Sequence, residues 1–261
     1  MALSEKIAAH LPYLRRYARA LSGSQTTGDA FVRATLEAAL EDSALKQSLE
    51  EGRVALYRAF NSVWSSAYLD VDAGDDSGAE SIASAKLTSI TPLNRQALLL
   101  TTLENFSVAQ AAEIMNLEPQ AVAGLIDEAI AEIDREAATN VLIIEDEPLI
   151  SMQLEDLVSG LGHEIFGTAA TRTQAQEQVA ERTPGLVLAD IQLADGSSGI
   201  DAVEDILAIA DVPVIFITAY PERLLTGDRP EPTYLITKPF EERTVRAAIS
   251  QALFFGHSKP I

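Results

Sequence analysis

The second half of the chain alternates short apolar runs with stretches in which apolar residues recur every three or four positions. Runs that are apolar throughout are typical of strands buried on both faces, and the longer spacing is typical of helices. We expect strands at 141–145, 164–168, 186–190, 214–218 and 234–237. We expect helices at 148–161, 172–181, 200–209, near 221–226, and at 241–255. Because parallel strands need crossover helices, this order predicts an α/β doubly wound five-stranded parallel sheet over residues 140–255.

The first half of the chain has helical spacing only, which predicts an all-α fold. Helices are expected at 3–21, 28–40 and 48–69. We expect Pro12 to break the first of them, with a second helix starting on the proline. Trp64 lies on the apolar positions of the third helix, so it is expected to pack in the core.

Residues 87–137 have the pattern of a helix-turn-helix. Ser107 and Gln110 have the spacing of a capping box at the start of a short helix. Asn116 suits the left-handed residue that ends such a helix, and Pro119 suits the first position of a longer one. A short helix, a tight turn and a longer helix together predict this motif.

An acid-rich stretch divides the helical half in two. Residues 70–80 contain five acids and two glycines and have little to bury, which is the composition of a linker. We therefore expect a helical subdomain at 1–69, an acidic linker at 70–86, a helix-turn-helix subdomain at 87–137, the α/β domain at 140–255 and a tail at 256–261.

Composition narrows the class of protein. The formal net charge of the 261 residues is −20, so nucleic acid and anionic lipid are excluded as partners unless a basic patch is present. The chain has no cysteine, which excludes disulfides and thiolate metal sites. The sequence shows neither a signal peptide nor an apolar run of the ~20 residues that a membrane span needs. We expect a cytoplasmic protein that does not contact a membrane.

Polar residues gather where the expected strands end. Three acids (Glu145, Asp146 and Asp190), the hydroxyl of Thr218 and the ammonium of Lys238 would meet at one edge of the sheet. Three carboxylates at close range repel one another, and a bound cation would reduce this repulsion. Because the candidate ligands are oxygen atoms and no histidine is near them in the sequence, we expect the ion to be Mg²⁺. Asp190 could then attack phosphorus as a nucleophile, while Lys238 and Thr218 bind phosphoryl oxygens.

These residues make 140–255 resemble a response-regulator receiver domain, which has a flavodoxin-like fold. The matching motifs are Glu145-Asp146, Asp190, Thr218-Ala219 and Lys238-Pro239-Phe240. The resemblance implies that Asp190 accepts a phosphoryl group from a histidine kinase or a phosphotransfer protein. The implied Mg²⁺ ligands are Glu145, Asp146, Asp190 and the backbone carbonyl of Gln192. A cis peptide bond before Pro239 is also implied.

The position of one aromatic residue departs from most receivers. Their switch aromatic lies on the fifth strand, two residues before the lysine, where this chain has Ile236. Tyr234 lies four residues before Lys238, and Tyr220 follows Thr218 by two. This pattern is similar to a receiver subfamily in which Tyr220 would act as the switch. The alternative for Tyr220 is an ordinary tyrosine of a surface loop.

The helical half resembles regions 2 and 4 of extracytoplasmic-function sigma factors. The match to region 2 is the run from Leu11 to Ala18, and the match to region 4 runs from Leu93 to Leu100 and from Glu104 to Ala112. The DNA-binding function does not carry over, because residues 104–136 contain eight acids and a single base. Acids beside phosphates are repulsive, so no DNA binding is expected.

A sigma-like domain joined to a C-terminal receiver is similar to the PhyR-type general stress response regulators. The resemblance implies an anti-anti-sigma factor that is not an enzyme. Its receiver would hold the sigma-like domain closed until Asp190 is phosphorylated, and the opened domain would then sequester an anti-sigma factor of the NepR type. The alternatives are a DNA-binding response regulator and an RNA-binding antiterminator fused to a receiver; both need a basic surface.

Overall fold

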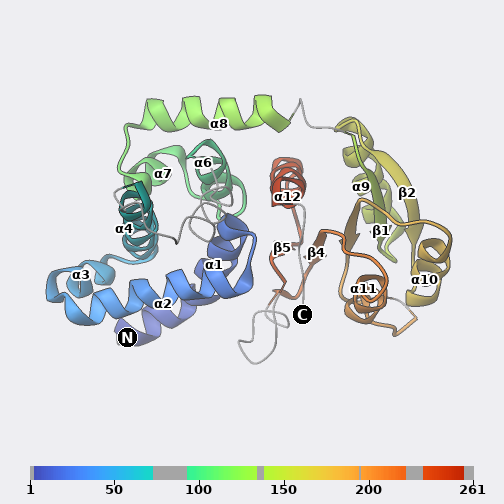
Figure 1. Ribbon diagram of the computed structural model, residues 1–261, viewed down its shortest axis with the longest axis horizontal. Coiled ribbons are helices and arrows are strands. Elements are labelled where there is room, and N and C mark those ends of the chain that lie inside the picture. The colour runs from blue at the N-terminus through green and yellow to red at the C-terminus, as the bar shows by residue number, and fades with distance from the viewer. Residues whose placement is uncertain (1–2, 73–92, 134–137, 194, 222–231, 256–261) are drawn as a thin grey trace. The chain divides into compact units, whose positions relative to one another are not determined.

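The computed structural model describes residues 3–72, 93–133, 138–193, 195–221 and 232–255. The chain divides into two compact units, 1–129 and 130–261 (Figure 1). Residues 73–86 of the expected linker, 222–226 of an expected helix and the tail 256–261 lie outside the described residues.

The first unit is helical in every described element, as predicted. Its helices are α1 (Leu3–Ser22), α2 (Gln25–Glu41), α3 (Ser43–Ser48), the 3₁₀ turn η1 (Leu49–Glu51), α4 (Arg53–Asp72), α6 (Leu93–Thr102), α7 (Val108–Met115) and α8 (Pro119–Ile133). The last residues of α8 fall in the second unit.

Two expected helix boundaries in this unit are wrong. Helix α1 continues through Pro12 without a break. A proline inside a helix removes one backbone hydrogen bond, and its ring crowds the carbonyl four residues earlier. Helix α1 buries Leu14, Tyr17 and Leu21 on one face, and we attribute the unbroken helix to this packing. The expected helix 48–69 is interrupted at Gly52, whose φ of +109° ends η1, so α4 begins at Arg53. The same helix continues to Asp72, so residues 70–72 of the expected linker are helical.

The core of the first unit is built on aromatic residues of α4. Tyr57 and Phe60 are fully buried, and Trp64 is 3% exposed. The Trp64 ring stacks on Phe60 at 6.1 Å between centroids and meets Phe31 of α2 at 4.7 Å. The prediction that Trp64 packs in the core is confirmed.

Helices α1 and α2 pack closely and are connected by ion pairs. A Cβ on Gly28 would lie 2.7 Å from the backbone nitrogen of Arg19, so the contact requires glycine. Arg15 and Arg19 both donate to the carboxylate of Asp29, at 2.9 Å each. Partial burial alone would raise the pKa of Asp29, but the two arginines outweigh burial and hold it below its usual value.

A buried carboxylate joins three segments that are distant in sequence. Oε1 of Glu104 accepts from Arg16 of α1 at 2.9 Å, and Oε2 accepts from Arg53 at 2.6 Å and from the hydroxyl of Tyr57 at 2.7 Å. The guanidinium of Arg53 also lies 4.3 Å from the ring centroid of Phe106. These five residues are called the Glu104 cluster, and they attach the loop after α6 to both α1 and α4.

The helix-turn-helix has the predicted caps. The side chain of Ser107 accepts from the backbone of Gln110, and the side chain of Gln110 accepts from the backbone of Ser107. Asn116 ends α7 with a left-handed φ of 54°. Helix α8 begins at Pro119, as expected.

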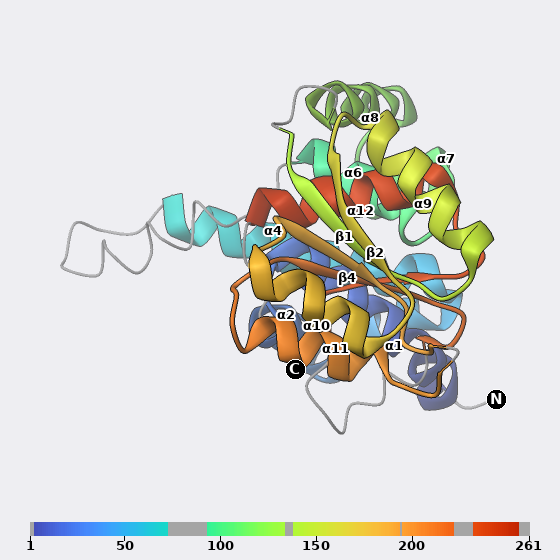
Figure 2. The same cartoon turned by 90° about the vertical axis from the view of Figure 1, so that its right-hand side faces the viewer.

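The second unit is the predicted parallel sheet. Its strands are β1 (Asn140–Ile144), β2 (Glu164–Ala169), β3 (Leu186–Ala189), β4 (Val214–Thr218) and β5 (Tyr234–Thr237), in the spatial order β2-β1-β3-β4-β5. Its described helices after α8 are α9 (Pro148–Gly160), α10 (Arg172–Glu181), α11 (Gly199–Leu207) and α12 (Glu242–Phe255). Helices α10 and α11 lie on one face of the sheet, and α9 and α12 lie on the other (Figure 2).

Side-chain alternation along the strands supplies both faces of this core. Leu142 and Ile144 of β1 and Val187 of β3 pack with residues of α10 and α11. The residues between them point to the opposite face, and they are fully buried as well. Burial on both faces explains why the strands are continuous apolar runs. Because all four strand pairs are parallel, the polar residues at the carboxyl ends of the strands lie at one edge of the sheet.

Candidate functional site

The strand ends meet as predicted. Glu145 directly follows β1, Asp190 follows β3, Thr218 ends β4 and Lys238 follows β5. The backbone ladder continues past the strands, because the amide of Asp190 donates to the carbonyl of Ile144 at 2.8 Å and the amide of Lys238 donates to the carbonyl of Thr218 at 2.7 Å. The backbone of each residue is therefore held by its neighbouring strand.

Lys238 lies between two of the carboxylates. Its Nζ donates to Oδ2 of Asp190 at 2.7 Å and to Oε2 of Glu145 at 2.8 Å, and 9% of its side chain is exposed. Burial alone would lower the pKa of Lys238, but the hydrogen bonds to Asp190 and Glu145 outweigh it and raise the pKa. Burial raises the pKa of Glu145, and the ammonium offsets only part of this effect.

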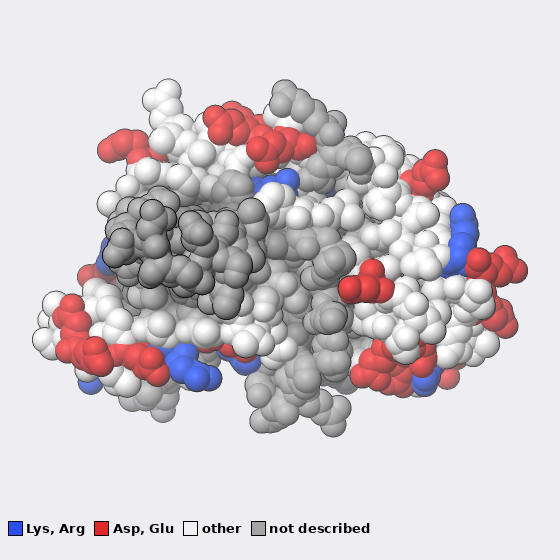
Figure 3. Space-filling model, in the orientation of Figure 1, with Lys and Arg blue, Asp and Glu red and all other residues white. Residues whose placement is uncertain are grey.

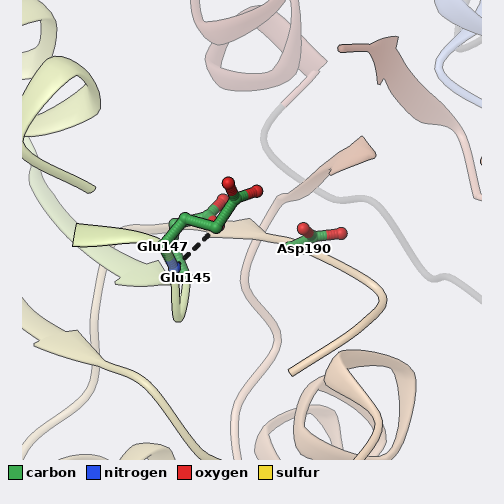
Figure 4. A group of neighbouring side chains, drawn as sticks. All are labelled: Glu145, Glu147 and Asp190. Atoms are coloured by element: carbon green, nitrogen blue, oxygen red, sulfur yellow. Dashed lines mark hydrogen bonds between the residues drawn. The ribbon is translucent and has the colours of Figure 1, made fainter. Parts of the chain in front are cut away.

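Three carboxylates converge on this point, and one of them was not predicted. Oxygens of Glu145, Glu147 and Asp190 all lie within 4.8 Å of one another (Figure 4). Glu147 also accepts from Nζ of Lys238 at 3.4 Å. Asp146 is not part of this group. Its position directly after Glu145 instead places it on the wall of the adjoining cavity.

The cavity has a volume of about 440 Å³ and opens at the carboxyl ends of the strands. Besides Asp190 and Lys238, it is lined by Asp146, Glu147, Gln192, Leu193, Ala219 and Tyr220. The backbone amide of Gln192 donates to Oδ1 of Asp190 at 3.3 Å, which turns the loop after β3 back over the aspartate. The peptide bond between Lys238 and Pro239 is cis, as expected.

The two tyrosines considered for a switch have different environments. Tyr220 is 44% exposed, and its amide donates to Oγ1 of Thr218 at 3.1 Å. In this bond the hydroxyl of Thr218 is the acceptor, so it can still donate its own hydrogen. Tyr234 is 3% exposed, and its hydroxyl donates to the carbonyl of Gln251 in α12 at 3.2 Å. Of these two aromatic side chains, Tyr220 is the one that borders the cavity.

Known families match all three parts of the chain. Residues 7–61 match the Sigma2 domain of PhyR, residues 87–136 match the sigma-like domain of the response regulator PhyR, and residues 141–250 match the response regulator receiver domain. The phyllosphere-induced regulator PhyR of Methylorubrum extorquens is 52% identical over 99% of this chain and 97% of its own length. The chain belongs to the PhyR family.

Solved structures of the PhyR family agree with the fold. PhyR of Brucella abortus is 49% identical, with a TM-score of 0.82 over 98% of this chain and 95% of its own. The anti-anti-sigma factor PhyR of Bartonella quintana is also 49% identical, with a TM-score of 0.81 over 97% of this chain and 96% of its own. Both alignments include the helical unit and the receiver.

The donor set of the receiver suits Mg²⁺. Carboxylate oxygens are the ligands that this ion prefers, and three of them converge beside the cavity. Receiver domains generally bind Mg²⁺, and the acidic edge of this sheet is the part of the described chain that has the chemistry to hold it.

Proposed function

We propose that this chain is a phosphorylation-activated anti-anti-sigma factor. Phosphorylation of Asp190 makes the helical unit available to an anti-sigma factor of the NepR type, and the extracytoplasmic-function sigma factor held by that protein is released. The observation that carries the proposal is the full-length similarity to PhyR proteins, one of them described as an anti-anti-sigma factor. The contact of Asp190 with Lys238 supports the chemistry.

In the proposed reaction, an oxygen of Asp190 forms a bond to the phosphorus of a phosphohistidine. The bond between phosphorus and the ring nitrogen breaks, and its electron pair stays on the nitrogen. The transferred group brings negative charge next to Asp190, where the ammonium of Lys238 already lies and can pair with it. The hydroxyl of Thr218 donates to a phosphoryl oxygen, and Ala219 leaves room for that oxygen on the cavity wall.

Mg²⁺ would be held by Glu145, Asp146, Asp190 and the backbone carbonyl of Gln192. When bound, it neutralises charge on the acids and on the phosphoryl group. Thr218 moves toward the phosphoryl group and pulls on the backbone of Tyr220 through their hydrogen bond. Tyr220 then changes its position at the cavity mouth, which is the proposed switch.

The exposed side of α8 supports a protein partner in preference to DNA. The positions that would face a groove are all exposed, and they are Gln120, Ala121, Gly124, Asp127 and Glu128. They include two acids and no base, and acidic side chains gather along α8 (Figure 3). Backbone phosphates would be repelled by this helix, so direct DNA reading is disfavoured.

We place the end of the first helical subdomain at Asp72, where α4 ends, instead of at 69. The boundaries at 86, 137 and 255 are those expected from the sequence, and the receiver turns over no external substrate. No helix among the described residues combines the length and the hydropathy that a membrane crossing requires. A cytoplasmic location stays a prediction.

Calorimetric titration of the full-length chain with the purified NepR-type protein of the same organism tests the proposal. We expect affinity to increase with Mg²⁺ and beryllofluoride, a phosphoryl mimic. Shifting the equilibrium from 1% open to 99% open takes ~5.5 kcal/mol of differential binding free energy, to which the phosphoryl group and the partner both contribute. For the variant Asp190→Asn, we expect the same affinity for the NepR-type protein with and without beryllofluoride. Equal affinity with and without beryllofluoride, or binding of promoter DNA at low salt, would refute the proposal.

A further inference from the structure

The site contains a further carboxylate, Glu147, which is not part of the acid pair Glu145-Asp146. It is 63% exposed, yet its Oε1 lies 3.4 Å from Nζ of Lys238, and one of its oxygens lies within 4.8 Å of oxygens of both Glu145 and Asp190. It also lines the cavity beside Asp190, and Figure 4 shows its side chain next to that of Glu145. Any ion or phosphoryl group in the cavity therefore lies close to its charge.

The local backbone explains why this side chain points to the site. Glu147 is the N-cap of α9, and its carbonyl accepts from the amide of Ser151 at 2.9 Å. Its own amide donates to Oε1 of Glu145 at 3.3 Å, so the backbone is held on both sides. Its side chain makes no capping hydrogen bond, and Pro148 follows at the first helical position. A short N-cap residue would turn its oxygen back to the helix, whereas this longer side chain extends toward Lys238.

We propose that Glu147 acts on the phosphorylation site through its negative charge. It strengthens binding of the divalent cation and weakens binding of the phosphoryl group. The inference rests on the proposed function. Its two effects have opposite signs because the same negative charge attracts the cation and repels the anion. A residue that merely supports the loop would change both affinities in the same direction.

The size of each effect follows from Coulomb's law. A unit charge about 5 Å from a divalent ion in water would change its affinity by about fifteenfold, and salt reduces this to about fivefold. Beryllofluoride carries a single negative charge, so its affinity at saturating Mg²⁺ should change by about twofold to threefold in the opposite direction.

The experiment uses the full-length chain and the variant Glu147→Gln, which keeps the size of the side chain and removes its charge. The control is Glu181→Gln, the same change at an exposed acid that ends α10. Mn²⁺ replaces Mg²⁺ as the probe, and the electron paramagnetic resonance signal of the free ion measures binding. Beryllofluoride affinity at saturating Mg²⁺ is measured by amide chemical shifts.

We expect Glu147→Gln to bind Mn²⁺ about fivefold to tenfold more weakly than Glu181→Gln and to bind beryllofluoride about twofold to threefold more tightly. Equal affinities in the two variants, or changes of the same sign, would overturn the inference. The variant Asp190→Asn separates this failure from that of the proposed function. If Asp190→Asn weakens Mn²⁺ binding and Glu147→Gln does not, only the role of Glu147 is wrong. If neither variant weakens it, the acidic site itself does not hold the cation, and both proposals fail.

Discussion

Replacing Glu104 with glutamine tests the importance of the Glu104 cluster for the helical unit. The carboxylate is fully buried and accepts hydrogen bonds from two guanidinium groups and a phenol. The amide of glutamine offers one acceptor oxygen, so its NH₂ group would face donors. The side chain of Arg16 is 6% exposed and that of Arg53 is 30% exposed, so at least one cation would lose its buried counter-charge.

Breaking a buried ion pair by removing one partner costs about 3–5 kcal/mol. We expect Glu104→Gln to lower the free energy of unfolding of the helical unit by that amount. With a urea dependence of about 2 kcal/mol per molar, the midpoint would fall by about 2 M. Trp64 is the single tryptophan of the chain and is buried in this unit, so its fluorescence reports the helical unit without a contribution from the receiver.

The matched control is Glu113→Gln. Glu113 also pairs with an arginine, Arg58, at 2.7 Å, but its side chain is 52% exposed. Exposed pairs contribute about 0–1 kcal/mol, so the midpoint of this variant should shift by less than 0.5 M, a value that follows from the same urea dependence. If the two variants shifted the midpoint equally, the argument from burial would be wrong.

Three further substitutions test other contacts. Asp29 has a lowered pKa, so its stabilising charge should be fully present above pH ~4 and be lost as pH falls through the lower folded value. The difference in unfolding free energy between wild type and Asp29→Asn should therefore shrink at acid pH; a constant difference would contradict the pairing. Gly28→Ala should destabilise the helical unit by roughly 2 kcal/mol, because its Cβ would overlap the backbone of Arg19, and an unchanged melting temperature would disprove this contact. Tyr220→Ala should leave beryllofluoride binding intact while abolishing its effect on partner affinity; if the partner response persisted, the proposed switch would be ruled out.

The receiver could be predicted from sequence more closely than the helical unit. Strands β4 and β5 begin and end where expected, and β1 and β3 differ by one residue, because strands buried on both faces are continuous apolar runs. The break at Pro12 was wrong because packing of the helix face outweighs one lost hydrogen bond. The interruption at Gly52 follows from a positive φ, which spacing of apolar residues does not reveal.

The candidate site shows a similar limit. Residues at strand ends were predicted because the sheet topology brings them together. Glu147 was missed because it lies in a loop; its place just before a proline at a helix start was the available signal. Glu104 was counted among the acids of a surface, yet it is 1% exposed. Its partners are 88, 51 and 47 residues away in sequence, and no local pattern connects them.

The hydrogen bond from Tyr234 to Gln251 has a consequence for how a signal leaves the receiver. In a receiver with a mobile fifth-strand aromatic, a ring can rotate while the strand stays in place. Here the tyrosine of the fifth strand lies two residues earlier, its ring is buried, and its hydroxyl donates to the backbone of α12, so a side-chain hydrogen bond joins β5 to α12. A displacement of β5, which is directly followed by Lys238, would pull on the helix through this bond. If the proposed movement of Tyr220 displaces β5, the strand and the helix would therefore shift together.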